Sequence, residues 1–472
     1  MKKFIAYFLA IIMTLGLCAC GNTGSGETTQ AAMEGLQVGY ARESILPEGQ
    51  VNLSGYGNQA HRISTGFLDM MYATCIAASE NGNTVLLFST DTLTAKDNWT
   101  AEARRLINES TGVPEGNIQI GGTHTHSSPA VGGSEELALQ WKNVYMSALV
   151  NSAKKAIADL APAKIYGSTI ETEGLTFVRH YTMSDGSYAD SSTSSSQLVA
   201  HATDANNTLM MIKFDREGDK KDIAVMNFQF HPTFIGTDSD TNLSADGVGA
   251  IRDVFEKETG MHFIYFTGSA GNQNPSSRLP GENPNGKGVN QMKQFGQKVC
   301  EFAFTAMENM EEISGSGVSC KQDTLTYASN DYGLDRLEDA KKAVEMFDKD
   351  GNSTAASNYA KTLGFTSVYE CRGIVANASR PATYTMTLDV VRIGDLGFVA
   401  APYEMFSNSA FQIREGSPFK YTLISSITNH YWNYFPTEEA FAAGCYESYT
   451  AVFASGIAEA TADKFVEMLK AV

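Results

Sequence analysis

Short apolar runs that end in polar loops recur along the chain. Six runs of this kind predict strands, over 85–90, 117–120, 223–230, 262–267, 396–401 and 421–426. Apolar residues spaced three and four apart predict helices between and after them, over 99–109, 141–160, 245–259, 290–310, 334–347 and 456–469. Strands that alternate with helices predict an α/β fold with mixed sheets, in which a ligand or metal site lies at the strand ends.

One part of the chain departs from this pattern. Segment 320–385 is less regular, with Asp and Gly turns around a helix. We interpret it as an insertion that covers the site.

The N-terminus predicts export. Two lysines precede the apolar run 4–17, which is too short to span a bilayer and has the length of a signal-peptide core. The run ends in a Leu-Cys-Ala-Cys-Gly sequence that resembles a bacterial lipobox, with Cys20 as the lipid-modified residue. The alternative is an ordinary cleaved signal with incidental cysteines. We expect a signal peptide at 1–20, a flexible tether at 21–34 and one extracytoplasmic domain at 35–472, anchored to a membrane through its lipid.

The composition narrows the classes of partner. Of the 472 residues, 43% are hydrophobic and 19% are charged, as in an ordinary globular protein. The formal net charge of −18 argues against a nucleic-acid partner, because phosphate backbones repel an acidic surface. Five cysteines follow the signal and form no C-x-x-C pair, which argues against a cysteine-rich metal site.

The chemistry concentrates in a segment with two histidines. His124 and His126 lie in the sequence Gly-Thr-His-Thr-His-Ser-Ser-Pro, directly after a predicted strand. Residues two apart in an extended segment point to the same side, so one histidine can bind a metal while the other reaches substrate. Taken alone, the motif also fits a turn with two solvated histidines. His231, at the end of another predicted strand, also fits a hydrogen-bonded structural residue.

Further segments change this balance. Segment 122–129 resembles the G-T-H-T-H-S-x-P segment of the neutral/alkaline ceramidase family. Other segments resemble that family in the same order: 38–42 with 52–56, 66–73, 227–232 with 243–246, 270–275, 401–404 and 429–446. Several motifs in the family's order are far more specific than any single one. The family typically carries a β-sandwich domain after the catalytic domain, whereas this chain ends at Val472, which weakens a specific expectation of ceramide as substrate.

The resemblance implies a site of seven residues. It implies a zinc ion held by four of them: His124, His231, Glu404 and Tyr434. Zinc accepts imidazole nitrogen and carboxylate oxygen, and a nearby cation favours the charged form of a tyrosine. The resemblance also implies three residues around the scissile amide: His126, Arg179 and Tyr446.

The active-site loop carries one departure from the family. Where ceramidases have a serine before Pro275, this chain has Asn274, which cannot accept an acyl group. Either the protein is inactive, or metal-bound water is the nucleophile and Asn274 positions substrate. We favour the second interpretation, because zinc can lower the pKa of bound water to roughly 7 and all four implied ligands are present.

These observations predict a zinc-dependent hydrolase of a linear amide in an N-acylated lipid, such as a sphingolipid, or in an N-acylated amine. His126 would relay a proton, and Arg179 and Tyr446 would stabilise the oxyanion. Two alternatives stay open: a zinc hydrolase of another bond, such as an ester or a glycan-linked amide, and a solute-binding lipoprotein without catalysis.

Overall fold

The computed structural model describes residues 35–472, apart from 57–61, 191–195, 236–239, 283–284 and 351. The expected signal peptide, Cys20 and the tether therefore lie outside the described residues. In the part of the chain that is described, no helix has the length and apolarity needed to cross a membrane.

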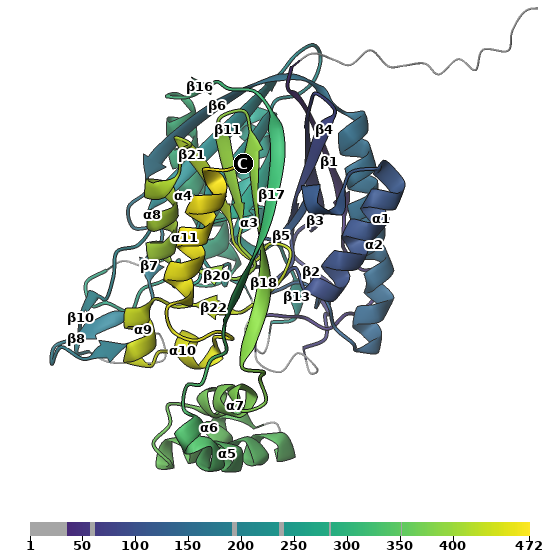
Figure 1. Ribbon diagram of the computed structural model, residues 1–472. Helices are drawn as coiled ribbons and strands as arrows, with labels where there is room; N and C mark the ends of the chain where they lie inside the picture. Colours follow the sequence, from purple (N-terminus) through teal and green to yellow (C-terminus); the bar gives the residue numbers. More distant parts are fainter. Residues whose placement is uncertain (1–34, 57–61, 191–195, 236–239, 283–284, 351) are drawn as a thin grey trace, which may run out of the picture. The chain divides into compact units, whose positions relative to one another are not determined.

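The larger sheet has nine strands and runs through the middle of the molecule (Figure 1). Its spatial order is β14 (His262–Thr267), β12 (Ile223–Phe228), β11 (Thr208–Arg216), β6 (Ala161–Glu171), β1 (Gln37–Ser44), β3 (Tyr72–Glu80), β4 (Asn83–Thr90) and β5 (Ile118–Gly122), with β16 (Glu311–Ile313) beside β6. The two outermost pairs, β12–β14 and β4–β5, are parallel, and the pairs between them are antiparallel. The sheet is therefore mixed.

A second sheet packs on the first. It consists of β17 (Val318–Ala328), β18 (Thr383–Ile393), β19 (Leu396–Ala400) and β21 (Tyr421–Ser425). Alternate apolar residues of both sheets, among them Val225, Phe266 and Phe398, share one core. Because successive side chains of a strand point to opposite faces, the other alternate residues are left to pack against helices.

Helices cover the outer face of each sheet. On the larger sheet these are α1 (Asp97–Thr111), α2 (Glu136–Ala158), α3 (Asp246–Thr259) and α4 (Val289–Met307). On the second sheet they are α8 (Ser407–Gly416) and α11 (Ile457–Leu469). The result is a four-layer α/β/β/α arrangement, which confirms the predicted α/β class with mixed sheets (Figure 1).

The remaining elements are short. They are β2 (Gly66–Phe67), β7 (Phe177–Val178), β8 (Tyr181–Met183), β9 (Tyr188–Ala189), β10 (Leu198–His201), β13 (Asn242–Leu243), β15 (Gln273–Asn274), β20 (Glu404–Met405), β22 (Tyr434–Phe435), α9 (Glu438–Ala443), α10 (Tyr446–Thr450) and the 3-10 turns Glu115–Asn117 and Leu334–Arg336. Several of them carry the site described below.

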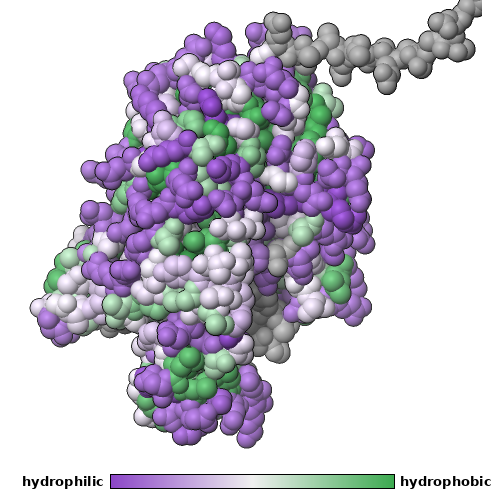
Figure 2. Space-filling view, viewed as in Figure 1, coloured by the Kyte–Doolittle hydropathy of each residue, from purple (hydrophilic) through white to green (hydrophobic). Residues whose placement is uncertain are grey.

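Segment 320–385 is more regular than expected. Strands β17 and β18 form a long hairpin, and its tip carries α5 (Leu337–Asp350), α6 (Ser353–Thr362) and α7 (Val368–Asn377), which share a small core of their own. In the distal halves of both strands, exposed polar residues alternate with apolar ones that pack on the core between the second sheet and its helices, so these halves carry no continuous apolar run. We call α5–α7 the helical cap; its helix α7 packs against α10. Apolar colour marks part of the cap on an otherwise largely hydrophilic face (Figure 2).

Candidate metal centre

The site lies where the two sheets meet at their strand ends. Although β5 and β14 are at opposite edges of the larger sheet, the Thr267 hydroxyl donates to the Gly122 carbonyl at 3.3 Å. The segment after β21 bridges the same two strands, because Ser426 N donates to Thr267 O and Gly122 N donates to Ile427 O. This closure brings the loop after β5 next to the loop after β12.

Three predicted ligands converge in that space. The Nε2 atoms of His124 and His231 are 3.1 Å apart, and Glu404 Oε2 lies 3.2 Å from the first and 3.3 Å from the second. All three side chains are buried. Donor atoms about 2.0–2.2 Å from one tetrahedral ion are roughly 3.3–3.6 Å from one another, so the observed triangle is close to the size that a zinc ion requires.

Hydrogen bonds to backbone carbonyls determine the tautomers of His124 and His231. His124 Nδ1 contacts the Leu93 carbonyl at 2.9 Å, and His231 Nδ1 contacts the Ala270 carbonyl at 2.7 Å. A carbonyl only accepts, so each Nδ1 must carry the proton, and in a neutral ring each Nε2 then presents a lone pair. Glu404 Oε2 is buried without a hydrogen-bond donor among the described residues. Three acceptors that face one another need a cation, so these residues fit a bound metal ion.

The backbone at His124 is strained to form this centre. Its φ is 68°, in the left-handed region that non-glycine residues adopt at a cost of roughly 1–3 kcal/mol. Such strain persists only where surrounding contacts hold it; here His124 N donates to the Thr92 carbonyl.

His126 borders the same centre. Its Nε2 lies 3.4 Å from that of His124, and the nitrogens of His124, His126 and His231 form a second possible set of metal ligands. Burial, followed by the charges of the other two histidines, lowers the pKa of His126 well below its usual value. A neutral imidazole beside the triad can accept a proton.

The predicted tyrosines and arginine surround the triad. Tyr434 is paired with Glu404 in the β20–β22 ladder, and its ring stacks on that of His231 with centroids 6.5 Å apart. The Arg179 guanidinium lies 5.3 Å from the centre of the Tyr434 ring, and the Tyr446 ring lies 5.8 Å from it. The structure therefore brings these predicted residues together, while the coordination of Tyr434 to a metal stays a prediction.

Asn274 lies in a short strand beside the segment that carries Arg179, and its role at the site stays a prediction. Strand β15 pairs with β7, so Asn274 is opposite Phe177, and Arg179 N donates to the carbonyl of Asn272 at 2.8 Å. The active-site loop is also close to β20, because a Cβ on Gly271 would lie 2.6 Å from the Glu404 carbonyl oxygen. Position 271 therefore has to be glycine, because any side chain there would clash with the backbone of β20.

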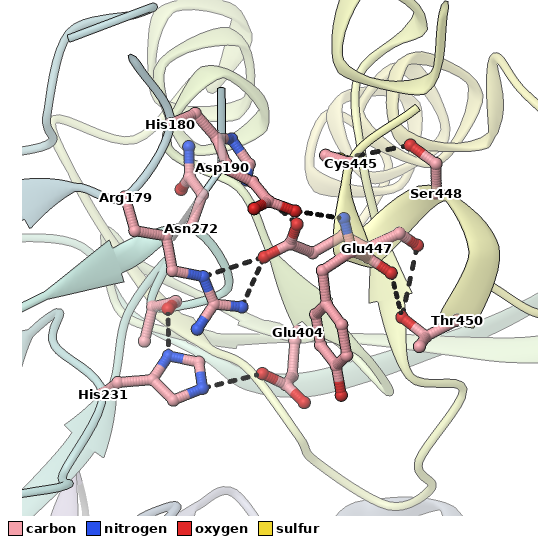
Figure 3. Close-up of polar contacts among 12 residues, drawn as sticks. Arg179, His180, Asp190, His231, Asn272, Glu404, Cys445, Glu447, Ser448 and Thr450 are labelled. Atoms are coloured by element: carbon pink, nitrogen blue, oxygen red, sulfur yellow. Dashed lines mark hydrogen bonds and ion pairs between the residues drawn. The ribbon is translucent and has the colours of Figure 1, made fainter. Parts of the chain in front are cut away.

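Two further residues of the site were not identified from the sequence. The Tyr431 hydroxyl donates to Glu404 Oε1 at 2.6 Å. Glu447 accepts hydrogen bonds from Arg179 and His180 (Figure 3). Burial alone would raise the pKa of Glu447, but Arg179 and His180 hold it well below its usual value. The sequence offered one indication of Glu447: it is a carboxylate that directly follows Tyr446 in a segment rich in aromatic residues.

A cavity of about 210 Å³ lies beside the triad. Three of its wall residues contact the triad or His126: Tyr431 bonds Glu404, Leu93 accepts from His124, and a Cβ on Gly55 would meet His126 at 2.6 Å. The full lining is Ser54, Gly55, Tyr56, Leu93, Thr94, Lys96, Ala130, Val131 and Tyr431.

A layered α/β fold with a buried His–His–Glu cluster defines a candidate metalloprotein. The chain belongs to the neutral/alkaline non-lysosomal ceramidase family, whose N-terminal model matches residues 37–366, so it is a ceramidase-like hydrolase. This confirms the resemblance seen in the sequence. No curated protein matches the chain.

Two solved structures share the fold. Neutral ceramidase from Pseudomonas aeruginosa matches with a TM-score of 0.68 at 19% identity, over 93% of this chain and 74% of that one. A ceramidase complexed with C2 matches with a TM-score of 0.68 at 18% identity, over 93% of this chain and 75% of that one. The TM-scores establish a common fold. At identities this low, the substrate of this chain has to be inferred from its own residues.

Proposed function

We propose that this protein is a zinc-dependent amidohydrolase that cleaves a linear amide in an N-acylated lipid or amine. The observation that carries the proposal is the convergence of two imidazole lone pairs and one carboxylate oxygen within 3.1–3.3 Å of one another. When bound, zinc supplies Lewis acidity, which polarises a carbonyl and lowers the pKa of water to roughly 7. His124, His231 and Glu404 would hold it, with Tyr434 as the proposed fourth ligand.

The other residues supply proton transfer and charge stabilisation. Because Asn274 has no nucleophilic oxygen, water attacks the carbonyl, and the neutral His126 takes its proton and passes it to the leaving nitrogen. Arg179 and the Tyr446 hydroxyl stabilise the oxyanion; one preorganised donor typically contributes on the order of 10²–10³ in rate. Burial raises the pKa of Tyr446 to about 12, so its hydroxyl keeps the proton that it donates.

The cavity beside the triad has a mixed lining. Tyr56, Leu93, Val131 and Tyr431 contribute apolar or aromatic surface, and Ser54, Thr94 and Lys96 contribute polar groups, which suits a small group with both characters. The chain belongs to the ceramidase family and shares its fold with solved ceramidases. Both observations favour an N-acylated lipid over a simple N-acylated amine as the substrate.

The metal assignment can be tested with one substitution and a matched control. His124→Ala should lose both bound zinc, measured by elemental analysis, and turnover of a fluorescent N-acylsphingosine probe. His262→Ala is the control, because His262 stacks on Tyr40 away from the triad, and it should keep both. Normal zinc content in His124→Ala would refute the ligand assignment. If the wild-type protein cleaved ester probes and no amide probe, the bond that it hydrolyses would be an ester.

We further propose that the protein is an extracytoplasmic lipoprotein anchored through Cys20. The lipobox-like sequence at the end of the apolar run supports this. Cys20→Ser should abolish incorporation of labelled palmitate in cells and shift the protein from the membrane to the soluble fraction, whereas Cys18→Ser should not. Unchanged labelling in Cys20→Ser would exclude this anchor.

A further inference from the structure

A buried ion pair lies beside the candidate metal centre. Glu447 Oε1 accepts two hydrogen bonds from Arg179, from Nε at 2.8 Å and from Nη2 at 2.5 Å. The other oxygen, Oε2, contacts His180 Nε2 at 2.9 Å. The side chain of Glu447 is 1% exposed and that of Arg179 is 9% exposed. Such a pair is held rigidly, because either charge alone would be costly in this environment.

The same carboxylate belongs to a second cluster of potential metal ligands. Atoms of His180, Cys445 and Glu447 lie within 4.8 Å of one another. However, both oxygens of Glu447 are already bonded, and the guanidinium of Arg179 already compensates its charge. Burial raises the pKa of the Cys445 thiol above its usual value, so the sulfur keeps its proton. The geometry therefore favours an ion pair over a second metal site.

Arg179 also faces the reaction centre. Its guanidinium carbon lies over the Tyr434 ring, 5.3 Å from the ring centre. In the close-up, the guanidinium occupies the space between Glu447 and the pair formed by His231 and Glu404 (Figure 3). One planar, charged group thus links Glu447 to the metal centre, and its orientation depends on the carboxylate that anchors it.

We propose that Glu447 is a positioning residue that fixes the Arg179 guanidinium at the reaction centre. This inference rests on the proposed amidohydrolase function, in which Arg179 stabilises the oxyanion. An arginine side chain has many rotamers, and a carboxylate oxygen that accepts from both Nε and Nη2 selects one of them before substrate arrives. Neutralising Glu447 would leave the buried cation without its counter-ion, and the guanidinium would turn toward solvent or toward Glu404.

The test is a double-mutant cycle on the full chain, with N-acylsphingosine turnover as the first readout. Glu447→Gln and Arg179→Ala should each lower kcat on the order of 10²–10³ with little change in KM. Because Glu447 acts through Arg179, the double variant should be no slower than Arg179→Ala alone. A further loss of kcat in the double variant would overturn the proposal.

The second readout does not depend on activity. Phenylglyoxal modifies accessible arginines, and peptide mapping reports each site separately. Glu447→Gln should raise the modification rate of Arg179 several-fold. The matched control is Asp159→Asn, because Asp159 Oδ2 pairs with the buried Arg216 at 2.5 Å on another part of the larger sheet. The control should expose Arg216 alone and leave kcat unchanged.

The two readouts separate two failures. If the wild-type chain cleaves no amide probe, the proposed function is wrong, while the labelling of Arg179 still decides whether Glu447 positions it. If the wild-type chain is active but labelling of Arg179 is unchanged in Glu447→Gln, the positioning role is wrong and the proposed function stands.

Discussion

Replacing Glu404 with glutamine separates metal binding from simple packing at the candidate centre. The carboxylate Oε2 faces the Nε2 atoms of His124 and His231 at 3.2 and 3.3 Å, and all three atoms are acceptors. A glutamine has the same shape but no charge, and its amide N–H₂ group can donate to either imidazole. The variant should therefore fold without metal as well as the wild type does, and it should bind zinc poorly.

The size of the effect follows from linkage. A metal present at 1,000 times its Kd stabilises the folded state by about 4.1 kcal/mol. Near 60 °C the unfolding entropy is roughly 2.1 cal/mol/K per residue, so a compact unit of about 440 residues has roughly 0.9 kcal/mol/K. Saturating zinc should therefore raise the melting temperature of the wild type by about 5 °C, and that of Glu404→Gln by much less.

Differential scanning calorimetry of the metal-free protein with and without zinc measures this directly. Glu370→Gln is the matched control, because Glu370 is also buried but accepts hydrogen bonds in the helical cap, from Thr366 and Tyr332. The control should keep the full zinc-dependent shift. An equal shift in Glu404→Gln would refute the argument that three facing acceptors define the metal centre.

Three further outcomes are expected. Tyr431→Phe removes the hydrogen bond to Glu404 Oε1 and should weaken zinc binding by about 10–100-fold in a chelator competition, whereas unchanged affinity would contradict a supporting role. Gly55→Ala places a Cβ 2.6 Å from His126, so kcat should fall while zinc content stays normal; equal losses of both would point to collapse of the whole site. Burial raises the pKa of Asp246 to about 7, so the folded state binds its proton more tightly and the free energy of unfolding should fall as pH rises from about 4 to 7. Asparagine tolerates the φ of 55° at this position, so Asp246→Asn should fold normally. In urea titrations the variant should show a weaker dependence of the free energy of unfolding on pH. An unchanged dependence would mean that other groups cause it.

The sequence alone indicated the α/β class, the strands that end near the site and several helices, but not β1, β3, β6 and β11 in the middle of the larger sheet. Strands such as 262–267 and helices such as 245–259 were predictable because each carries an apolar pattern within a few residues, and burial in two cores preserves that pattern. His124 and His231 were identifiable because each follows such a strand within a motif. The distal halves of the β17–β18 hairpin were missed, because apolar residues such as Leu325 and Met386 alternate there with polar ones, whereas the predicted strands were continuous apolar runs.

Tertiary structure alone decided which of these residues meet. Arg179 and Glu447 are 268 positions apart, and their ion pair exists only because the loop after β7 and helix α10 reach the same end of both sheets. The same closure turns the Nε2 atoms of His124 and His231 toward Glu404. Each ring is oriented by one backbone carbonyl from another loop, which accepts a hydrogen bond from its Nδ1. Local patterns specify strands and helices, whereas the orientation of a buried polar group depends on partners that are distant in the chain.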